Sequence, residues 1–174
     1  MMGTTHSVTG MALWAGLGPM ITQDPLELFA GLVISAVLPY GADLDHPNST
    51  SSRKIWGPLH RHMGKGIAAM LGGHRMGAHS LAACLLAGLS IAALVTAVAP
   101  ESATALGLAG LIGWFGGVFG DMLTKKGVGF FWPLSRRRFG IPIFTTNTLG
   151  EQVFNVAQAL TGAWFAYLHF GGSL

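Results

Sequence analysis

Residues 78–99 form an uninterrupted run without Asp, Glu, Lys or Arg, and this run most strongly restricts how the chain can fold. A helix of about 20 apolar residues crosses the roughly 30 Å hydrocarbon core of a bilayer. The whole chain agrees, because 51% of its 174 residues are hydrophobic and only 10% are charged. A soluble domain carries about 25% charged residues, and a short chain needs them to cover its core. The sequence therefore predicts an integral membrane protein.

Four further apolar segments occupy residues 8–20, 26–40, 103–120 and 152–170. The first two are shorter than a perpendicular span requires, so each is a partial span or a helix extended by its polar ends. Asp24-Pro25 precedes the second segment and is typical of a helix cap followed by a first-turn proline. We expect an all-α bundle of four to five apolar helices, with residues 1–174 forming a single domain.

The basic residues indicate how this bundle is oriented. All 10 Lys and Arg residues fall in two polar stretches, residues 41–77 and 121–150. Cytoplasmic loops of membrane proteins carry an excess of Lys and Arg. We therefore expect a multi-pass protein of the bacterial inner membrane, with both polar loops and the N-terminus in the cytoplasm. Topology explains the basic residues, so no nucleic-acid partner is expected, although the basic clusters also fit contact with anionic membrane lipid.

The densest group of reactive side chains is Asp43-Leu44-Asp45-His46, directly after the second apolar segment. Carboxylates beside a membrane segment are costly unless they are paired, and a divalent cation is the expected partner. In an extended turn, Asp43 and Asp45 would point to one side, where a cation could bridge them. The alternative is a helix-ending turn with solvated carboxylates. His46 fits a metal ligand, a support for a ligand, or an ordinary turn residue.

Two histidines, His74 and His79, stand in the turn that leads into the apolar run at residues 78–99. Imidazole suits zinc and other first-row metals, whereas a lone histidine is usually structural. Their pairing next to a helix start, on the same face as the carboxylates, favours metal ligation. Arg75 between them can bind a phosphate or a carboxylate through two nitrogens, or can extend to the membrane surface.

Three more candidates, His6, Asp121 and Glu151, stand at the ends of the remaining segments. Taken alone, His6 is an ordinary N-terminal histidine or a helix cap. Asp121 can pair with Lys125 four residues later, and Glu151 can complement a helix N-terminus. In the expected topology all candidates nevertheless fall on the cytoplasmic side, and that topology was derived from Lys and Arg alone. The sequence therefore predicts one metal site at that face.

A series of short motifs runs along most of the chain, and each one alone is weak. In chain order they are Thr5-His6-Ser7, Leu38-Pro39 followed by Asp43-Leu44-Asp45-His46, His74 to Ser80, Asp121-Met122-Leu123-Thr124, Gly127-Val128, Trp132-Pro133 and Glu151. Together, this order resembles the YdjM-type, LexA-regulated, membrane-bound metal-dependent hydrolases. That family is similar in outline to zinc-dependent phospholipases C and single-strand nucleases, which hydrolyse phosphoesters with His and Asp ligands on a helical bundle. The resemblance implies a metal-binding set of His6, Asp43, Asp45, His74, His79, Asp121 and Glu151.

The chain departs from this family pattern in three places. Gly117 stands where the family usually has a histidine four residues before the Asp matched to Asp121. Ala78 replaces a small polar residue before His79, and Gly41-Ala42 lengthens the spacing between Pro39 and the acidic pair. Three outcomes stay open: fewer bound metals, recruitment of His46 or His60 as a ligand, or a site without activity.

The function favoured by these observations is a membrane-bound metal-dependent hydrolase that acts on a phosphoester or ester of a lipid-like substrate at the cytoplasmic membrane face. The cofactor expected is a divalent metal, with zinc preferred, which would activate water and polarise the substrate. The expected ligands are His6, Asp43, Asp45, His74, His79 and Asp121. Asp45 or Glu151 would serve as general base, and Arg75 and His46 would contact substrate phosphate.

Two other functions compete with this one. In a non-catalytic membrane protein, a metal or a His/Asp cluster would tie helices together, and protein ligands would then close the site. A transporter would place carboxylates near the membrane midplane, but here the acidic residues cluster at segment ends. The alternatives make different predictions for turnover, so activity measurements separate them.

Overall fold

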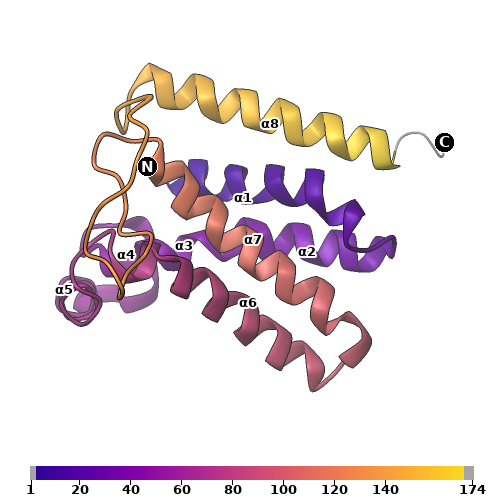
Figure 1. Ribbon diagram of the computed structural model, residues 1–174, viewed down its shortest axis with the longest axis horizontal. Coiled ribbons are helices and arrows are strands. Elements are labelled where there is room, and N and C mark those ends of the chain that lie inside the picture. The colour runs from indigo at the N-terminus through magenta and orange to yellow at the C-terminus, as the bar shows by residue number, and fades with distance from the viewer. Residues whose placement is uncertain (1–2, 171–174) are drawn as a thin grey trace.

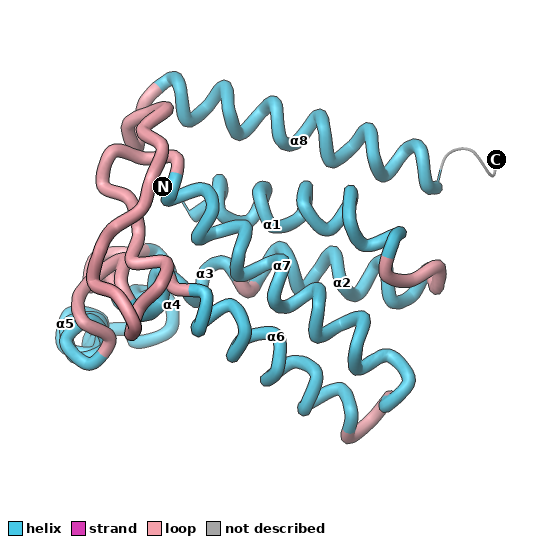
Figure 2. Tube along the Cα trace, in the orientation of Figure 1, coloured by secondary structure: helices cyan, strands magenta, loops and turns pink. Residues whose placement is uncertain are grey.

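The computed structural model describes residues 3–170, and these residues form helices and loops without any β-strand (Figure 1, Figure 2). The predicted all-α fold is confirmed. The five long helices are α1 (Gly3–Leu17), α2 (Pro25–Val37), α6 (Leu81–Thr96), α7 (Ala103–Met122) and α8 (Leu149–Phe170). The shorter elements are η1 (Gly18–Met20), α3 (Pro39–Ala42), η2 (Asp43–Asp45), α4 (Thr50–Trp56), η3 (Gly57–Leu59), α5 (His60–Met70), η4 (Gly77–His79) and η5 (Pro100–Ser102), where η denotes a 3₁₀ turn.

Two helical stretches are long and apolar enough to cross a membrane, Pro25–Asp45 and Pro100–Met122. The run at residues 78–99, expected to be the clearest span, instead contains α6, which has 16 residues. The helix starts late because Ser80 has an extended backbone and its Oγ accepts a hydrogen bond from the Ala83 N–H at 3.2 Å. This cap leaves His79 in the preceding 3₁₀ turn, where it can face the site.

The two basic stretches lie at the same end of the bundle (Figure 1). The first, expected as a loop, is largely helical, because Ser49 caps α4 and α5 follows after η3. The second is a long loop with two isolated β-bridges, Thr124 to Phe144 and Val128 to Phe139 (Figure 2). The opposite end holds the short turns between α1 and α2 and between α6 and α7 (Figure 1).

Small residues let α7 approach its neighbours closely. A Cβ atom at Gly116 would lie 2.6 Å from the Cα of Gly10 on α1, and one at Gly113 would lie 2.7 Å from the Cα of Ser35 on α2. Close backbone approach through Gly and Ser is typical of helix packing in membranes. Next to this contact, Trp14 is 1% exposed and its Nε1 donates to the Leu28 carbonyl at 2.9 Å. The crossing fixes α1, α2 and α7 relative to one another.

Large apolar side chains point outward along the long helices. They include Phe29 on α2, Leu86 and Leu89 on α6, and Val156 and Leu160 on α8, and each of these is at least 60% exposed. A soluble protein rarely exposes apolar patches of this extent, whereas lipid-facing helices do so regularly. The outer surface of the bundle is therefore suited to a hydrocarbon environment.

Candidate metal centre

Residues far apart in the sequence meet where the polar end joins the helical bundle. His6 is the fourth residue of α1, and Asp121 lies in the last turn of α7. Asp43 and Asp45 belong to η2, which continues from α2 and α3. His79 lies in η4, after the turn that contains His74 and Arg75. The glycine contacts between α1 and α7 hold the first two of these residues at a short distance.

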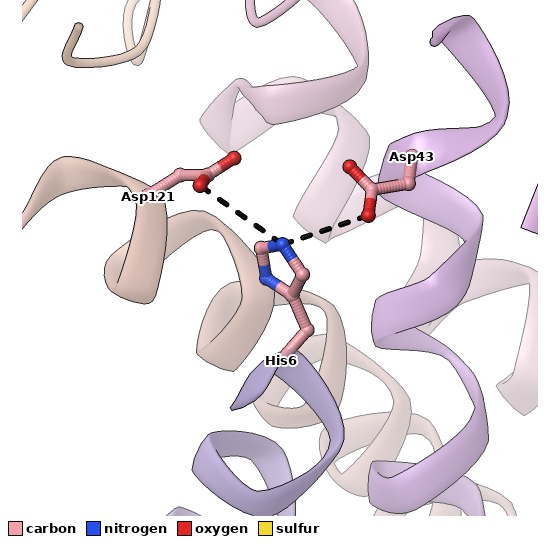
Figure 3. Close-up of side chains that lie close together, drawn as sticks. All are labelled: His6, Asp43 and Asp121. Atoms are coloured by element: carbon pink, nitrogen blue, oxygen red, sulfur yellow. Dashed lines mark ion pairs between the residues drawn. The ribbon is translucent and has the colours of Figure 1, made fainter. Parts of the chain in front are cut away.

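His6 stands between two carboxylates (Figure 3). Its Nε2 atom lies 3.6 Å from Oδ2 of Asp43 and 3.9 Å from Oδ1 of Asp121. Ligand atoms of these three residues all lie within 4.8 Å of one another, so the group could hold a metal ion. The His6 and Asp121 side chains are at most 1% exposed, and the Asp43 side chain is 13% exposed. Asp43 is therefore the member through which the group reaches solvent.

The other ring nitrogen of His6 decides how the imidazole can be used. Nδ1 lies 2.9 Å from the Gly117 carbonyl, which can only accept, so Nδ1 carries the proton and donates. In the neutral ring, Nε2 then presents a lone pair toward the two carboxylates, and it has no hydrogen-bond partner among the described residues. A buried lone pair facing two negative groups calls for a cation, and a backbone-oriented histidine is the usual form of a metal ligand. The donor set of one imidazole and two carboxylates fits zinc.

Asp121 also contacts two residues on the far side of the group. Its Oδ1 lies 2.9 Å from the Arg75 guanidinium and its Oδ2 lies 3.0 Å from Nε2 of His79. Arg75 also donates to the hydroxyl of Thr124 at 2.7 Å, and that hydroxyl donates to the Asp121 carbonyl at 2.8 Å. The expected alternative pairing of Asp121 with Lys125 does not describe this arrangement, because the carboxylate faces the bundle interior and Lys125 is exposed.

Asp45 forms a second centre beside the first. Its carboxylate is fully buried and lies 2.8 Å from Nδ1 of His74, accepts from the Arg75 N–H at 3.2 Å, and lies 3.9 Å from Nδ1 of His79. The expectation that Asp43 and Asp45 face one side is wrong. The segment is a 3₁₀ turn with about three residues per turn, so positions two apart point in different directions. Asp43 therefore faces His6 while Asp45 faces the histidines of the next turn.

The turn that carries His74 and Arg75 is held in an uncommon backbone conformation. Gly72, Gly73 and Arg75 have φ angles of 79°, 115° and 65°, and only glycine adopts such values without strain. The second basic stretch holds this turn, because Gly129 donates to the Arg75 carbonyl at 2.7 Å. Arg138 likewise donates to the His74 carbonyl at 3.2 Å. The loop therefore fixes both residues beside the carboxylates.

A cavity of about 870 Å³ adjoins this cluster. Asp43, His46, His74 and Arg75 reach its wall from the cluster, and Lys54 and Lys126 reach it from the two basic stretches. The pKa of His46 lies below its usual value. The main cause is the partial burial of the ring, and the neighbouring His74 is the next largest cause. The His46 ring is therefore neutral near pH 7 and can donate or accept a hydrogen bond in the cavity. Such a cavity is large enough for a small organic substrate.

The chain was compared with known proteins. A model of the YdjM inner membrane protein family matches residues 1–172. The chain belongs to this family. The family resemblance inferred from the motif order is thus confirmed, and the family description supports the inner-membrane location. No curated protein and no solved structure matches the chain. The likeness to zinc-dependent phospholipases C stays a prediction.

Within this YdjM-family chain, Gly117 has a defined role although it lacks a metal-binding side chain. Its carbonyl orients His6, and a Cβ atom at this position would lie 3.2 Å from Nδ1 of His6 and 3.3 Å from Cβ of Pro39. A side chain at this position would therefore crowd both the His6 ring and Pro39. The family pattern has a histidine at this position, and glycine instead leaves free the space that a side chain would occupy beside His6.

Other candidates occupy different surroundings. Glu151 is fully buried and accepts from the Asn147 N–H at 2.6 Å, as expected for a carboxylate that complements the start of α8. Nδ1 of His60 lies 2.8 Å from the Gly57 carbonyl in η3, the turn directly before α5, so this ring is used locally. Sequence reasoning missed the Gly117 carbonyl, Lys54 and Lys126. No sequence signal marks a backbone acceptor. Lys54 was interpreted as a topology residue, and Lys126 as a topology residue or part of a basic cluster that contacts anionic lipid.

Proposed function

We propose that this protein is a multi-pass inner-membrane hydrolase that uses a divalent metal, with zinc expected, to cleave a phosphoester or ester of a lipid-like substrate. The observation that carries the proposal is His6 facing Asp43 and Asp121 beside a cavity that Arg75 also lines. Metal-assisted hydrolysis needs side chains that bind a metal, a positively charged side chain such as the buried Arg75, and an adjoining cavity.

In the proposed topology, α1, α2, α6, α7 and α8 cross or enter the bilayer and the cluster end faces the cytoplasm. All 10 Lys and Arg residues belong to the two stretches at that end. Three acidic residues, Asp24, Glu27 and Glu101, lie at or near the turns of the opposite end. The asymmetry of Lys and Arg sets orientation in membranes, so the proposal places the cavity at the level of the lipid headgroups.

Cysteine labelling tests this orientation. The single native cysteine, Cys84, is fully buried and is first changed to alanine. In intact spheroplasts, a membrane-impermeant maleimide is expected to label Glu101→Cys and to leave Leu134→Cys unlabelled, because positive-inside topology puts position 134 in the cytoplasm. Both variants should label after permeabilisation. Labelling of Leu134→Cys alone in intact spheroplasts would reverse the proposed orientation.

The residues around the cluster divide into binding and proton-handling groups. His6, Asp43 and Asp121 would hold the metal, which when bound supplies Lewis acidity toward a phosphoryl oxygen and lowers the pKa of water. Arg75 binds and orients a phosphoryl oxygen at the cavity wall. Asp45 accepts from Nδ1 of His74, which leaves His74 Nε2 as a proton acceptor toward the cavity. Asp45 thus acts through His74, in place of the direct role expected from the sequence.

A second cavity, of about 460 Å³, supports a lipid-like substrate. Its wall is almost entirely apolar and includes Leu71, Leu86, Ile91 and Trp132. The η2 turn borders both cavities, because it contributes Asp43 to the first and Leu44 and Asp45 to the second. An acyl or prenyl chain in the apolar cavity would bring an attached phosphoester close to the metal centre.

Turnover tests the proposal against a purely structural cluster. The structural alternative is favoured by one observation, since His6, Asp43 and Asp121 join α1, η2 and α7 and would stabilise their packing with any bound cation. With zinc-loaded full-length protein in detergent and a short-chain phospholipid, we expect metal-dependent release of the headgroup. His74→Gln should lower kcat/KM about 100-fold, in the range that general base catalysis contributes.

His60→Gln is the matched control, because His60 bonds to the Gly57 carbonyl in the preceding turn and does not line the cavity. Its turnover should equal that of the native protein. Stoichiometric zinc binding without hydrolysis of any phosphoester or carboxylic ester would refute the enzymatic proposal and support the structural alternative.

A further inference from the structure

The wall of the 870 Å³ cavity carries more positively charged than negatively charged side chains. Lys54, Arg75 and Lys126 line it, and Asp43 is the one carboxylate among the described lining residues. Asp43 itself is directed toward His6, at 3.6 Å. Arg75 is likewise paired with Asp121, at 2.9 Å, so Lys54 and Lys126 supply the unpaired charge of the wall, which favours an anion and repels a cation.

Arg75 marks where that anion would bind. Its side chain is 6% exposed, and two of its guanidinium nitrogens are used, NH1 toward Thr124 and NH2 toward Asp121. Its third nitrogen, Nε, is buried and has no hydrogen-bond partner among the described residues. A buried N–H of a charged group without an acceptor is costly, so the Arg75 guanidinium keeps donor capacity for a phosphoryl oxygen at the cavity wall.

The remaining polar wall carries hydroxyl and amide groups and few aromatic faces. Thr4, Asn48, Thr50 and Thr146 line the cavity, and Tyr40 is its one Phe, Tyr or Trp within the described chain. Recognition of a quaternary ammonium group uses several aromatic faces or carboxylates, whereas the described wall offers one of each, Tyr40 and Asp43. Hydroxyl and amide groups instead match the hydroxyls of a polyol.

We propose that this cavity selects a phosphoryl headgroup that bears hydroxyl groups and no ammonium group, as in phosphatidylglycerol. The inference rests on the proposed function and specifies its substrate class. The same headgroup chemistry occurs in a membrane lipid and in a water-soluble phosphodiester of glycerol. The apolar cavity beyond η2 favours the lipid form, because only the lipid has a chain to bury there.

Binding to metal-free, full-length protein in an uncharged detergent tests the inference without requiring turnover. The probes are dihexanoyl phosphatidylglycerol, dihexanoyl phosphatidylcholine and water-soluble glycerophosphoglycerol. We expect phosphatidylglycerol to bind at least about tenfold more tightly than phosphatidylcholine, because the ammonium group faces like charges. Tighter binding of the lipid than of glycerophosphoglycerol identifies a lipid ligand, and equal binding identifies the free headgroup. Equal affinity for both lipids would overturn the inference.

Two pairs of lysines separate the cavity from the general positive charge of the surface. Lys54 and Lys126 line the cavity, whereas Lys65 and Lys125 are exposed in the same two stretches and do not line it. The double change Lys54→Gln with Lys126→Gln should weaken phosphatidylglycerol binding about 25-fold, or about fivefold for each lysine. Lys65→Gln with Lys125→Gln should change it less than about twofold, because an exposed lysine away from the ligand is screened by solvent. Equal losses in both pairs would show surface attraction only and would contradict a selective cavity.

The outcome for the headgroup is separable from the outcome for hydrolysis. Selective phosphatidylglycerol binding without turnover would support the cavity inference and refute the enzymatic proposal. Turnover of phosphatidylcholine at the same rate as phosphatidylglycerol would support hydrolysis and refute the headgroup inference.

Discussion

Gly10→Ala is expected to destabilise the bundle by about 3 kcal/mol, at the upper end of the usual cost of overpacking. A Cβ atom at this position would overlap the Ser35 carbonyl of α2 and would lie 3.0 Å from Cγ of Pro39 and 3.2 Å from the Gly113 carbonyl. Two of these three neighbours are backbone atoms, so no side-chain rotation can relieve the overlap. Helix α1 must therefore move away from α2 and α7.

The same displacement should weaken the metal centre. Gly10 lies one helical turn after His6 on α1, and the neighbouring helices lead to Asp43 and Asp121. Moving α1 outward separates His6 Nε2 from both carboxylates, so Gly10→Ala should lower zinc affinity as well as stability. The effect on affinity arises through position alone, because the substitution leaves every ligand in place.

Gly66→Ala is the matched control for this prediction. Gly66 lies within α5, and a Cβ atom there would meet nothing within 4 Å. Alanine is a better helix former than glycine, so this change should stabilise the protein by up to about 1 kcal/mol. Unfolding of detergent-solubilised protein, followed by circular dichroism, measures both variants. Equal melting temperatures for Gly10→Ala and Gly66→Ala would show that the helices are not packed as closely as described.

The long helices follow from features that are local in the sequence. The apolar segment expected at residues 103–120 corresponds to α7 at Ala103–Met122. Its limits were predictable because a turn at Pro100-Glu101-Ser102 precedes it and the next charged residue is Asp121. The helical parts of residues 41–77 were not expected, because their composition is basic and polar. There the Ser49 cap and the packing of α5 on η2 determine helix formation, and apolar periodicity is a weak guide.

The candidate site was likewise predictable in part: its members followed from the sequence, but their partners did not. The topology expected from the sequence put the segment ends that carry His6, Asp43, His79 and Asp121 on one membrane face. These residues were therefore predicted to be neighbours, and the structure brings them together. The partners within the cluster were not predictable from spacing. They depend on the 3₁₀ turn that separates Asp43 from Asp45, and on the turn at Arg75, which has a positive φ and whose guanidinium pairs with Asp121.

Loss of zinc from His6→Gln and Asp43→Asn is the second large effect we expect. Changing a residue that merely orients a metal ligand costs about 10–100-fold in affinity, so loss of a ligand itself should cost at least about 100-fold. Asp43→Asn keeps the shape of the side chain, and the Asp43 side chain is 13% exposed, so the fold should tolerate the change. Asp121 is less suitable for this test because it also pairs with Arg75 and His79.

The two controls change the same residue types outside the cluster. His60→Gln alters a histidine that bonds to Gly57, and Asp24→Asn alters the cap of α2 while keeping a capping side chain. Added zinc should raise the melting temperature of the native protein and of both controls, since a ligand that binds only the folded state stabilises it. The melting temperatures of His6→Gln and Asp43→Asn should not respond.

The most direct test of the metal centre is the zinc content of full-length protein that has been stripped with chelator, reloaded with zinc and desalted. Elemental analysis should find about one zinc per chain in the native protein, in His60→Gln and in Asp24→Asn, since one imidazole and two carboxylates can hold a single ion. His6→Gln and Asp43→Asn should retain almost none. Native zinc content in these two variants would contradict a metal centre at His6, Asp43 and Asp121.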